Sequence, residues 1–245
     1  MSTQLNGSLL KGFEILRLFS PERPEITANI VQSELGLNGA TAHRFLATLE
    51  ETGAIVPVRR GRYRLGYALS DLGRLASETN PVLPTMRPLM EALTASLSES
   101  VMLCRLGRTG PTCLIVVEAD RPITVGIKVG TSLDLLASAQ GRIWLADLER
   151  SQRQTVVANS MASGGSDTLE ALHDTLAAIR DDGIAVNRGD VEPDIAAVAV
   201  PVRTRTGRLA YTLSVFGPLS RFSDTFVTRA ATELKDTAAR IGRLL

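Results

Sequence analysis

One segment, residues 26–66, constrains the fold more than any other part of the 245-residue chain. Within it, Ala42, Phe45, Leu46 and Leu49 recur at the spacing of one helical face, which predicts a helix with a buried apolar stripe. Polar and basic side chains occupy the opposite face, namely Thr41, His43, Arg44 and Thr48. Such a helix suits the major groove of DNA, because arginine bonds guanine edges or phosphates and the threonine methyl group contacts thymine.

Start and stop signals on both sides predict a helix-turn-helix. Thr27 is the expected N-cap of a preceding helix, and Gly36 is expected to end that helix in a left-handed conformation. Asn38 is the expected N-cap of the second helix, and Gly53 is expected to end it. The turn between the two helices is therefore short, as the motif requires.

A basic β-hairpin is predicted directly after this helix, with strands at 55–58 and 62–65. Tyr63 and Leu65 alternate with two arginines, so one face is expected to be apolar and the other cationic. A cationic wing beside a recognition helix contacts phosphates or the minor groove. The alternative is a helical hairpin and a strand pair with an ordinary solvated face. The predicted DNA-binding residues are Thr27, Asn38, Ala40, Thr41, His43, Arg44, Thr48, Arg59, Arg60, Arg62 and Arg64.

Charge is local rather than global. The whole chain carries a net charge of only +1, whereas residues 38–67 contain five arginines against two glutamates, a net of +3. One copy of so modest a basic surface binds DNA weakly. We therefore expect a symmetric oligomer that binds repeated half-sites of double-stranded DNA.

The length and the 44% hydrophobic content allow one large or two small domains with sizeable cores. No apolar run of about 18 residues occurs, and the N-terminal sequence lacks the pattern of a signal peptide, so we expect a cytoplasmic protein without a membrane segment. Cys104 and Cys113 lie in apolar surroundings and are interpreted as reduced core residues.

The remaining periodicities predict an α+β fold, since helices and strands mix without strict alternation. The helix expected at 67–79 is either a linker and dimer seam or one more core helix, and the domain boundary is expected near 81–84. Residues 161–166 are expected to form a flexible loop. The other helices are predicted at 9–20, after Ser8, and at 86–97, 138–148, 150–159, 169–182 and 225–245. The other strands are predicted at 101–106, 113–117, 123–129, 184–186, 196–202 and 209–216.

Catalytic and metal-binding motifs are missing together. His43 and His173 have no partner at metal-ligand spacing, and no nucleophile elbow, phosphate loop or dinucleotide motif occurs. The acidic residues within 190–194 are interpreted as a solvated cluster. We expect no enzyme activity, no metal and no cofactor.

Residues 136–141 stand out because small residues open a predicted helix there. Free N–H groups at a helix start can hold an anion. The strands at 197–202 and 212–218 are candidates for the opposite wall, with Ser214 and Phe216 on one side of the sheet. The spacing alone favours a simpler interpretation, in which small residues let the helix pack closely on the sheet.

Taken in order, several segments make the chain resemble the IclR family of bacterial transcription regulators along nearly its whole length. The segments are SLLKGFEILRLF, ATAHRFLATLEETGAI, GRYRLG, LLASAQGRIWLA, GIAVNRGDVEPDIAAVAVPV and LSVFGPLSRF. The resemblance implies a winged helix-turn-helix domain at 1–66, a linker helix at 67–83, and a GAF-like effector-binding and oligomerisation domain at 84–245. It also implies dimers or tetramers on palindromic operators.

Effector contacts follow from the same resemblance. The implied effector-binding residues are Leu136, Ser138, Ala139, Gln140, Gly141, Ala197, Ala199, Ser214 and Phe216. Phe216 stands where some acid-binding members have serine, so the expected effector of this repressor is a larger, partly apolar or aromatic acid. Asp134, Asp194 and Phe216 depart from the family pattern, which motivates an alternative in which the C-terminal domain only oligomerises. A small-molecule enzyme with a DNA-binding appendage is the third hypothesis.

Overall fold

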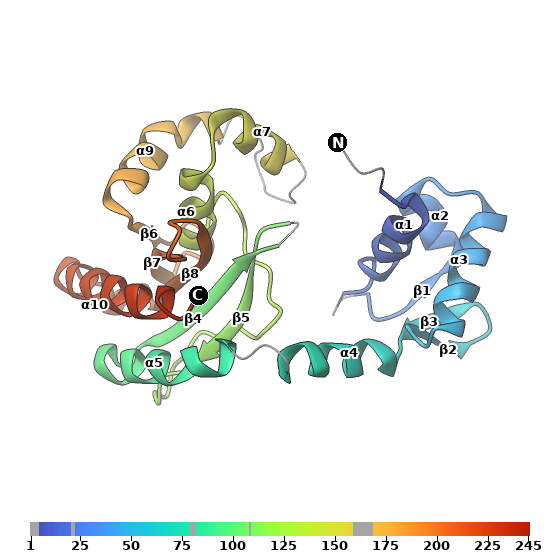
Figure 1. The fold of residues 1–245 in the computed structure, drawn as a ribbon, viewed down its shortest axis with the longest axis horizontal. Coiled ribbons are helices and arrows are strands. Elements are labelled where there is room, and N and C mark those ends of the chain that lie inside the picture. The colour runs from blue at the N-terminus through green and yellow to red at the C-terminus, as the bar shows by residue number, and fades with distance from the viewer. Residues whose placement is uncertain (1–4, 21–22, 79–81, 108, 159–168) are drawn as a thin grey trace. The chain divides into compact units, whose positions relative to one another are not determined.

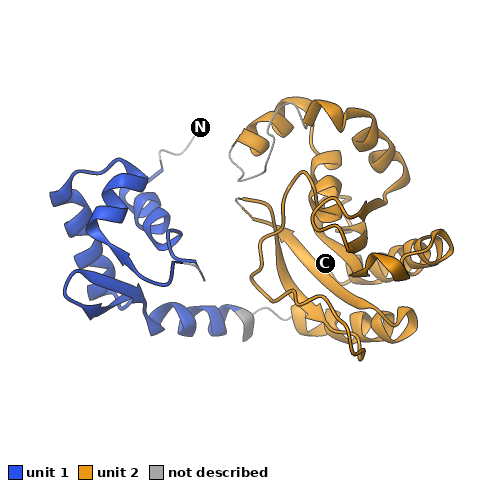
Figure 2. Ribbon diagram, turned by 180° about the vertical axis from the view of Figure 1, so that it is seen from behind, with its two compact units in different colours: residues 1–80 blue, residues 81–245 orange. Residues whose placement is uncertain are grey.

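The computed structural model describes residues 5–20, 23–78, 82–107, 109–158 and 169–245. The chain divides into two compact units, residues 1–80 and 81–245 (Figure 2). The loop predicted at 161–166 lies outside the described residues. Across the described part of the chain, no helix is both long enough and apolar enough to cross a bilayer.

The first unit is a helical bundle with a small sheet. Its elements, labelled in Figure 1, are α1 (Gly7–Leu16), β1 (Ile26–Thr27), α2 (Ala28–Leu35), α3 (Gly39–Glu51), β2 (Ile55–Arg59), β3 (Arg62–Leu65) and α4 (Tyr67–Glu78). The strands pair antiparallel in the order β1-β3-β2. This arrangement is a winged helix-turn-helix, in which β2 and β3 form the wing.

The core of the first unit forms where the predicted apolar stripes meet. Val31 of α2, Leu46 of α3 and Ile55 of β2 are fully buried together with Ile15 of α1. Gly36 adopts a left-handed conformation, with φ of 63°, and ends α2 as predicted. This turn lets α3 cross α2 with the apolar stripe of α3 facing the core.

The second unit is a five-stranded sheet covered by helices. Its elements are α5 (Val82–Leu97), β4 (Ser100–Leu106), β5 (Pro111–Val117), α6 (Ala139–Asp147), α7 (Arg150–Ala158), α9 (His173–Asp182), β6 (Ala185–Arg188), β7 (Ile195–Arg203), β8 (Leu209–Pro218), η1 (Leu219–Arg221) and α10 (Asp224–Gly242). The sheet order is β5-β4-β8-β7-β6, and every neighbouring pair is antiparallel.

Alternation along the strands gives the sheet two buried faces. On one face, Val198 and Val215 pack with the apolar sides of α5 and α10. On the other face, Ala199 and Phe216 pack with α6 and α9. Figure 1 shows these helices as two layers with the sheet between them.

Three local predictions are corrected. Helix α1 begins after Asn6, whose side chain accepts a hydrogen bond from the Leu9 amide at 3.0 Å, and not after Ser8. Residues 123–129 form no strand and pair with none, and the one isolated bridge to β5, Thr112 to Ser132, lies just after this segment. Ile26–Thr27 forms an unpredicted strand, which pairs with β3.

Candidate functional site

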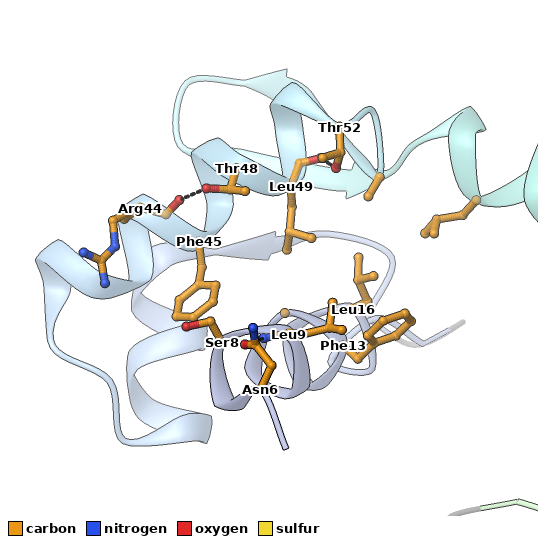
Figure 3. A pocket seen from close by; sticks show the side chains of 13 residues that line it. Asn6, Ser8, Leu9, Phe13, Leu16, Arg44, Phe45, Thr48, Leu49 and Thr52 are labelled. Carbon is orange, nitrogen blue, oxygen red and sulfur yellow. Dashed lines mark hydrogen bonds between the residues drawn. The ribbon is translucent and has the colours of Figure 1, made fainter. Parts of the chain in front are cut away.

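Helix α3 is held so that one face points outward. Asn38 caps it as predicted, because its side-chain oxygen accepts a hydrogen bond from the Thr41 amide at 2.9 Å. Ala42 and Leu46 are fully buried on the inner face. His43 and Arg44 are exposed, and Figure 3 shows the Arg44 guanidinium extending away from the helix.

Several arginines on this unit have uncompensated charge. Arg44, Arg59, Arg60 and Arg64 are exposed, and none forms an ion pair with any residue that the structure describes. Arg62 differs, since it contacts the Glu25 carboxylate at 3.3 Å. Arginines without a protein partner remain available for phosphate oxygens or base edges.

The two faces of β3 differ as predicted, since Tyr63 and Leu65 alternate with Arg62 and Arg64 along the strand. Tyr63 packs against the core, whereas Leu65 on the same face is 47% exposed. β1 pairs with only the first half of β3, so the apolar face is covered at Tyr63 and open at Leu65.

Some predicted DNA-binding residues have structural tasks. The Thr27 hydroxyl accepts a hydrogen bond from the Ile30 amide at 3.3 Å and so caps α2. The Thr48 hydroxyl donates to the carbonyl of Arg44 at 2.8 Å, a bond drawn in Figure 3. Ala40 is exposed near the start of α3, and Thr41 is half-buried. Contact of these residues with DNA stays a prediction.

In the second unit, the start of α6 is closed by side chains of the protein itself. The Ser138 hydroxyl accepts a hydrogen bond from the Gly141 amide at 3.0 Å. One carboxylate oxygen of Asp134, Oδ1, accepts hydrogen bonds from the amides of Leu136 and Ala137, both at 2.7 Å. Three of the N–H groups that we expected to be free are therefore occupied.

A cavity of about 320 Å³ adjoins this helix start. Five predicted effector-binding residues line it, namely Ser138, Ala139, Gln140, Ala197 and Phe216. The other lining residues are Met102, Val125, Ile127, Thr131, Ser132, Leu133, Asp134, Asn187, Val191, Glu192 and Ile195. The wall is mainly apolar with a few polar groups, as in typical sites for small molecules.

Four predicted effector-binding residues lie behind the cavity wall. Ser214 is fully buried, and its hydroxyl accepts a hydrogen bond from the Gln140 side-chain amide. Gly141 lies so close to Leu135 that an added Cβ would be 2.1 Å from the carbonyl oxygen of that residue. Leu136 and Ala199 are buried in the core between α6 and the sheet. These four residues hold α6 against the sheet.

The sequence analysis missed the wall that residues 125–132 and 187–195 provide. Asn187 is 4% exposed and connects that wall to α6, since its side-chain nitrogen donates to the Ala137 carbonyl at 2.8 Å. Its side-chain oxygen accepts hydrogen bonds from the amides of Gly189 and Asp190. Val125 and Ile127 alternate with other residues as in a strand, but this alternation places both side chains in the cavity wall and not in the strand predicted at 123–129.

The acidic residues within 190–194 are all exposed to solvent, as predicted. Two of them also have contacts that the sequence did not indicate. Asp190 forms an ion pair with Arg142 at 2.7 Å, and Glu192 lines the cavity.

Cys104 and Cys113 are free, fully buried cross-strand neighbours on β4 and β5. A hydrogen bond between their thiols, with burial, raises the pKa of Cys104, and the same bond lowers the pKa of Cys113. Since both lie in the core, they are structural residues, as the sequence predicts. Within the described residues, no group of three or more His, Cys, Asp or Glu side chains is arranged to hold a metal ion.

Comparison with known proteins places both units in one family. A family model described as the IclR helix-turn-helix domain matches residues 8–59, and one described as the C-terminal part of bacterial IclR transcriptional regulators matches residues 76–243. The transcriptional regulator KipR of Bacillus subtilis is 26% identical over 97% of this chain and 96% of its own. The DNA-binding transcriptional repressor YiaJ of Escherichia coli is also 26% identical, over 97% of this chain and 87% of its own.

Solved structures show the same fold. An IclR-family regulator from Brucella abortus matches with a TM-score of 0.84 at 22% identity, over 97% of this chain and 92% of that one. An IclR homologue from Microbacterium hydrocarbonoxydans, solved with 4-hydroxybenzoate, matches with a TM-score of 0.72 at 24% identity, over 96% and 98% of the two chains. The chain therefore belongs to the IclR family of DNA-binding transcriptional regulators.

Proposed function

We propose that this regulator is a repressor whose DNA binding responds to a small organic molecule. The observation that supports this most directly is Arg44, which is exposed on the outer face of α3, next to a wing with three further exposed arginines; none of the four forms an ion pair with a described residue. The same chain carries a cavity in its second unit. A ligand that binds one conformation of the protein better than another shifts the population toward it.

The cavity at α6 is the proposed effector site. Its volume of about 320 Å³ suits a molecule of one ring with substituents. The IclR homologue solved with 4-hydroxybenzoate supports a ligand of this size in the family. The effector class predicted from the sequence is an organic acid.

We also propose that the protein works as a homodimer or homotetramer on a palindromic operator. Apolar side chains on α1 and α4 are exposed in the single chain, including Leu9 at 63%, Phe13 at 52% and Leu72 at 63%. Figure 3 shows Phe45 and Leu49 of α3 extending toward α1 around a cavity of about 610 Å³ in the first unit. A second copy would cover these surfaces and place a second α3 on the same duplex.

We further propose that α4 (Tyr67–Glu78) links a DNA-binding domain at 1–66 to an effector domain formed by the second unit. The linker helix predicted at 67–83 is corrected at its end, since residues 79–81 lie outside the described residues and α5 begins at Val82. A protein that regulates bacterial transcription acts on DNA in the cytoplasm. We propose no catalytic activity, because the described homologues are regulators.

Binding of the full chain to DNA upstream of its own gene tests the proposal. We expect saturable binding in fluorescence anisotropy, stronger than to unrelated DNA of equal length, and released by an effector. Equal affinity for every duplex would contradict the DNA-binding assignment. If operator binding is specific but thermal shift finds no ligand, the alternative of a purely oligomerising C-terminal domain is favoured.

A further inference from the structure

The carboxylate of Asp134 lies in the segment just before α6. Its Oδ1 atom accepts hydrogen bonds from the amides of Leu136 and Ala137 at 2.7 Å each, so the carboxylate of a ligand cannot bind these two groups. Both amides precede the N-cap Ser138, whereas the amides of Ala139 and Gln140, in the first turn of α6, have no hydrogen-bond partner among the described residues. Ala139 and Gln140 line the cavity together with Asp134, so a ligand anion at the helix start would have a carboxylate in the same wall.

The rest of the cavity wall provides no positive charge. Among the described residues that line it, Asp134 and Glu192 are ionisable, and neither lysine, arginine nor histidine is present. Arg142 lies close by but is engaged twice, since its Nε donates to the Leu136 carbonyl at 2.9 Å and its guanidinium contacts Asp190 at 2.7 Å. A bound anion would therefore meet carboxylates and have no cation to pair with.

Asp134 is suited to accept a hydrogen bond from a ligand. It is half-buried, and its second carboxylate oxygen has no hydrogen-bond partner among the described residues. Apolar side chains such as Met102, Ile127 and Phe216 form much of the remaining wall. The site thus combines an apolar space with an acceptor that favours N–H donors.

We propose that the effector is a small apolar molecule with an amide, amine or amidine group that donates to Asp134, and that carboxylates are rejected. This inference rests on the proposed effector function of the cavity, and it replaces the organic acid that the sequence predicts. Asp134 is the specificity-determining residue, because it occupies the amides of Leu136 and Ala137 and adds negative charge to the wall that also contains the first turn of α6.

Three ligands of nearly the same shape test the proposal: benzoate, benzamide and benzamidine, with charges of −1, 0 and +1 near neutral pH. Binding to the full chain is measured by isothermal titration calorimetry. We expect benzamide and benzamidine to bind at least about tenfold more tightly than benzoate. Their N–H groups can donate a hydrogen bond to the Asp134 carboxylate, whereas the carboxylate of benzoate is repelled by it.

The variant Asp134→Asn keeps an oxygen that can accept from the two amides but removes the charge. We expect it to lower the affinity for benzamidine and to raise the affinity for benzoate, each by about tenfold. Asp194→Asn is the matched control, because Asp194 is exposed and does not line the cavity. Circular dichroism checks the folding of each variant, and Asp134→Ser replaces Asp134→Asn if the latter unfolds.

Each other outcome overturns a different statement. Tightest binding of benzoate to the unchanged protein overturns the proposed ligand class and leaves the effector cavity in place. An unchanged order of affinities in Asp134→Asn overturns the role of Asp134. If none of the three ligands binds either protein at millimolar concentration, the proposed ligand class is overturned together with the effector role of the cavity, and specific operator binding then still supports a DNA-binding regulator whose C-terminal domain only oligomerises.

Discussion

At the scale of single residues, we expect Arg44 to contribute most to how the first unit recognises DNA. It is exposed on α3 and forms no ion pair with a described residue. We predict that Arg44→Ala weakens operator binding by about 1–3 kcal/mol and relaxes the preference for operator over unrelated DNA, because a base contact is lost. Fluorescence anisotropy with both duplexes measures the two effects.

Arg105→Ala is the control for this variant, since Arg105 is an exposed arginine on β4 of the second unit. It removes the same charge from the chain and should leave the operator preference unchanged. If Arg44→Ala and Arg105→Ala behave alike, α3 is not the recognition helix.

Glu99 is the residue for which charge and burial conflict most strongly. Its side chain is 3% exposed, and it accepts two hydrogen bonds from Arg221, one of them at 2.8 Å. We predict that Arg221→Ala destabilises the protein by about 2–3 kcal/mol, because a buried carboxylate loses its main partner. Urea denaturation measures the change.

A surface pair provides the comparison. Arg203 contacts Asp147 at 2.6 Å, but its side chain is 43% exposed. Arg203→Ala should therefore cost less than about 1 kcal/mol. Equal losses of unfolding free energy in Arg221→Ala and Arg203→Ala would show that the burial of Glu99 does not increase the contribution of its ion pair to stability.

At the scale of helices and strands, local signals were predictable and long-range pairing was not. The caps Thr27 and Asn38 act on amides three residues ahead, so the sequence predicts them directly. Ser138 caps α6 over the same distance, but the sequence analysis expected free N–H groups there and did not predict this cap. In contrast, the strand Ile26–Thr27 exists only because β3 lies beside it, and no local sequence pattern predicts this pairing. The same limit explains the error at 123–129, where apolar alternation marks a cavity wall.

Close packing of α6 on the segment before it gives a prediction at this scale. A Cβ at Gly141 would lie 2.1 Å from the Leu135 carbonyl oxygen, a distance that real structures do not tolerate. We predict that Gly141→Ala lowers the free energy of unfolding by more than about 2 kcal/mol, because α6 must shift away from Leu135. Thermal or urea denaturation reports the loss.

Gly126→Ala is the matched control in the same unit. A Cβ at Gly126 would meet no atom within 4 Å, so this change should be neutral or stabilise by less than about 1 kcal/mol through the unfolded chain. A small effect at both glycines would contradict the tight contact between α6 and Leu135.

At the scale of the whole molecule, the site was only partly predictable. Both strands behind the cavity were expected, and the register pairs Ala197 with Phe216 and Ala199 with Ser214. Which of the two pairs faces the cavity depends on how α6 lies on the sheet: Ala197 and Phe216 line it, whereas Gln140 bonds to Ser214 of the other pair. Asp134 can accept hydrogen bonds from the Leu136 and Ala137 amides because the chain bends before α6. From the sequence alone, Asp134 is recognisable only as a departure from the family pattern.

Assembly is the remaining property at this scale, and the exposed leucines of α4 make it testable. Leu72 is 63% exposed and Leu75 is 51% exposed, three residues apart on one helical face. We predict that Leu72→Glu combined with Leu75→Glu disrupts the oligomer, since the interface would have to bury carboxylates. Sedimentation velocity should then show a smaller species.

The same variant should also bind DNA differently, because one basic unit instead of two would contact each duplex. We expect the slope of the logarithm of affinity against the logarithm of salt concentration to fall by about half, since half as many phosphates are neutralised. Ile123→Glu, at a 69% exposed position in the second unit, is the control and should alter neither mass nor slope. Unchanged mass and slope in the α4 variant would mean that copies of the chain join through another surface, and α4 would then be only a connector.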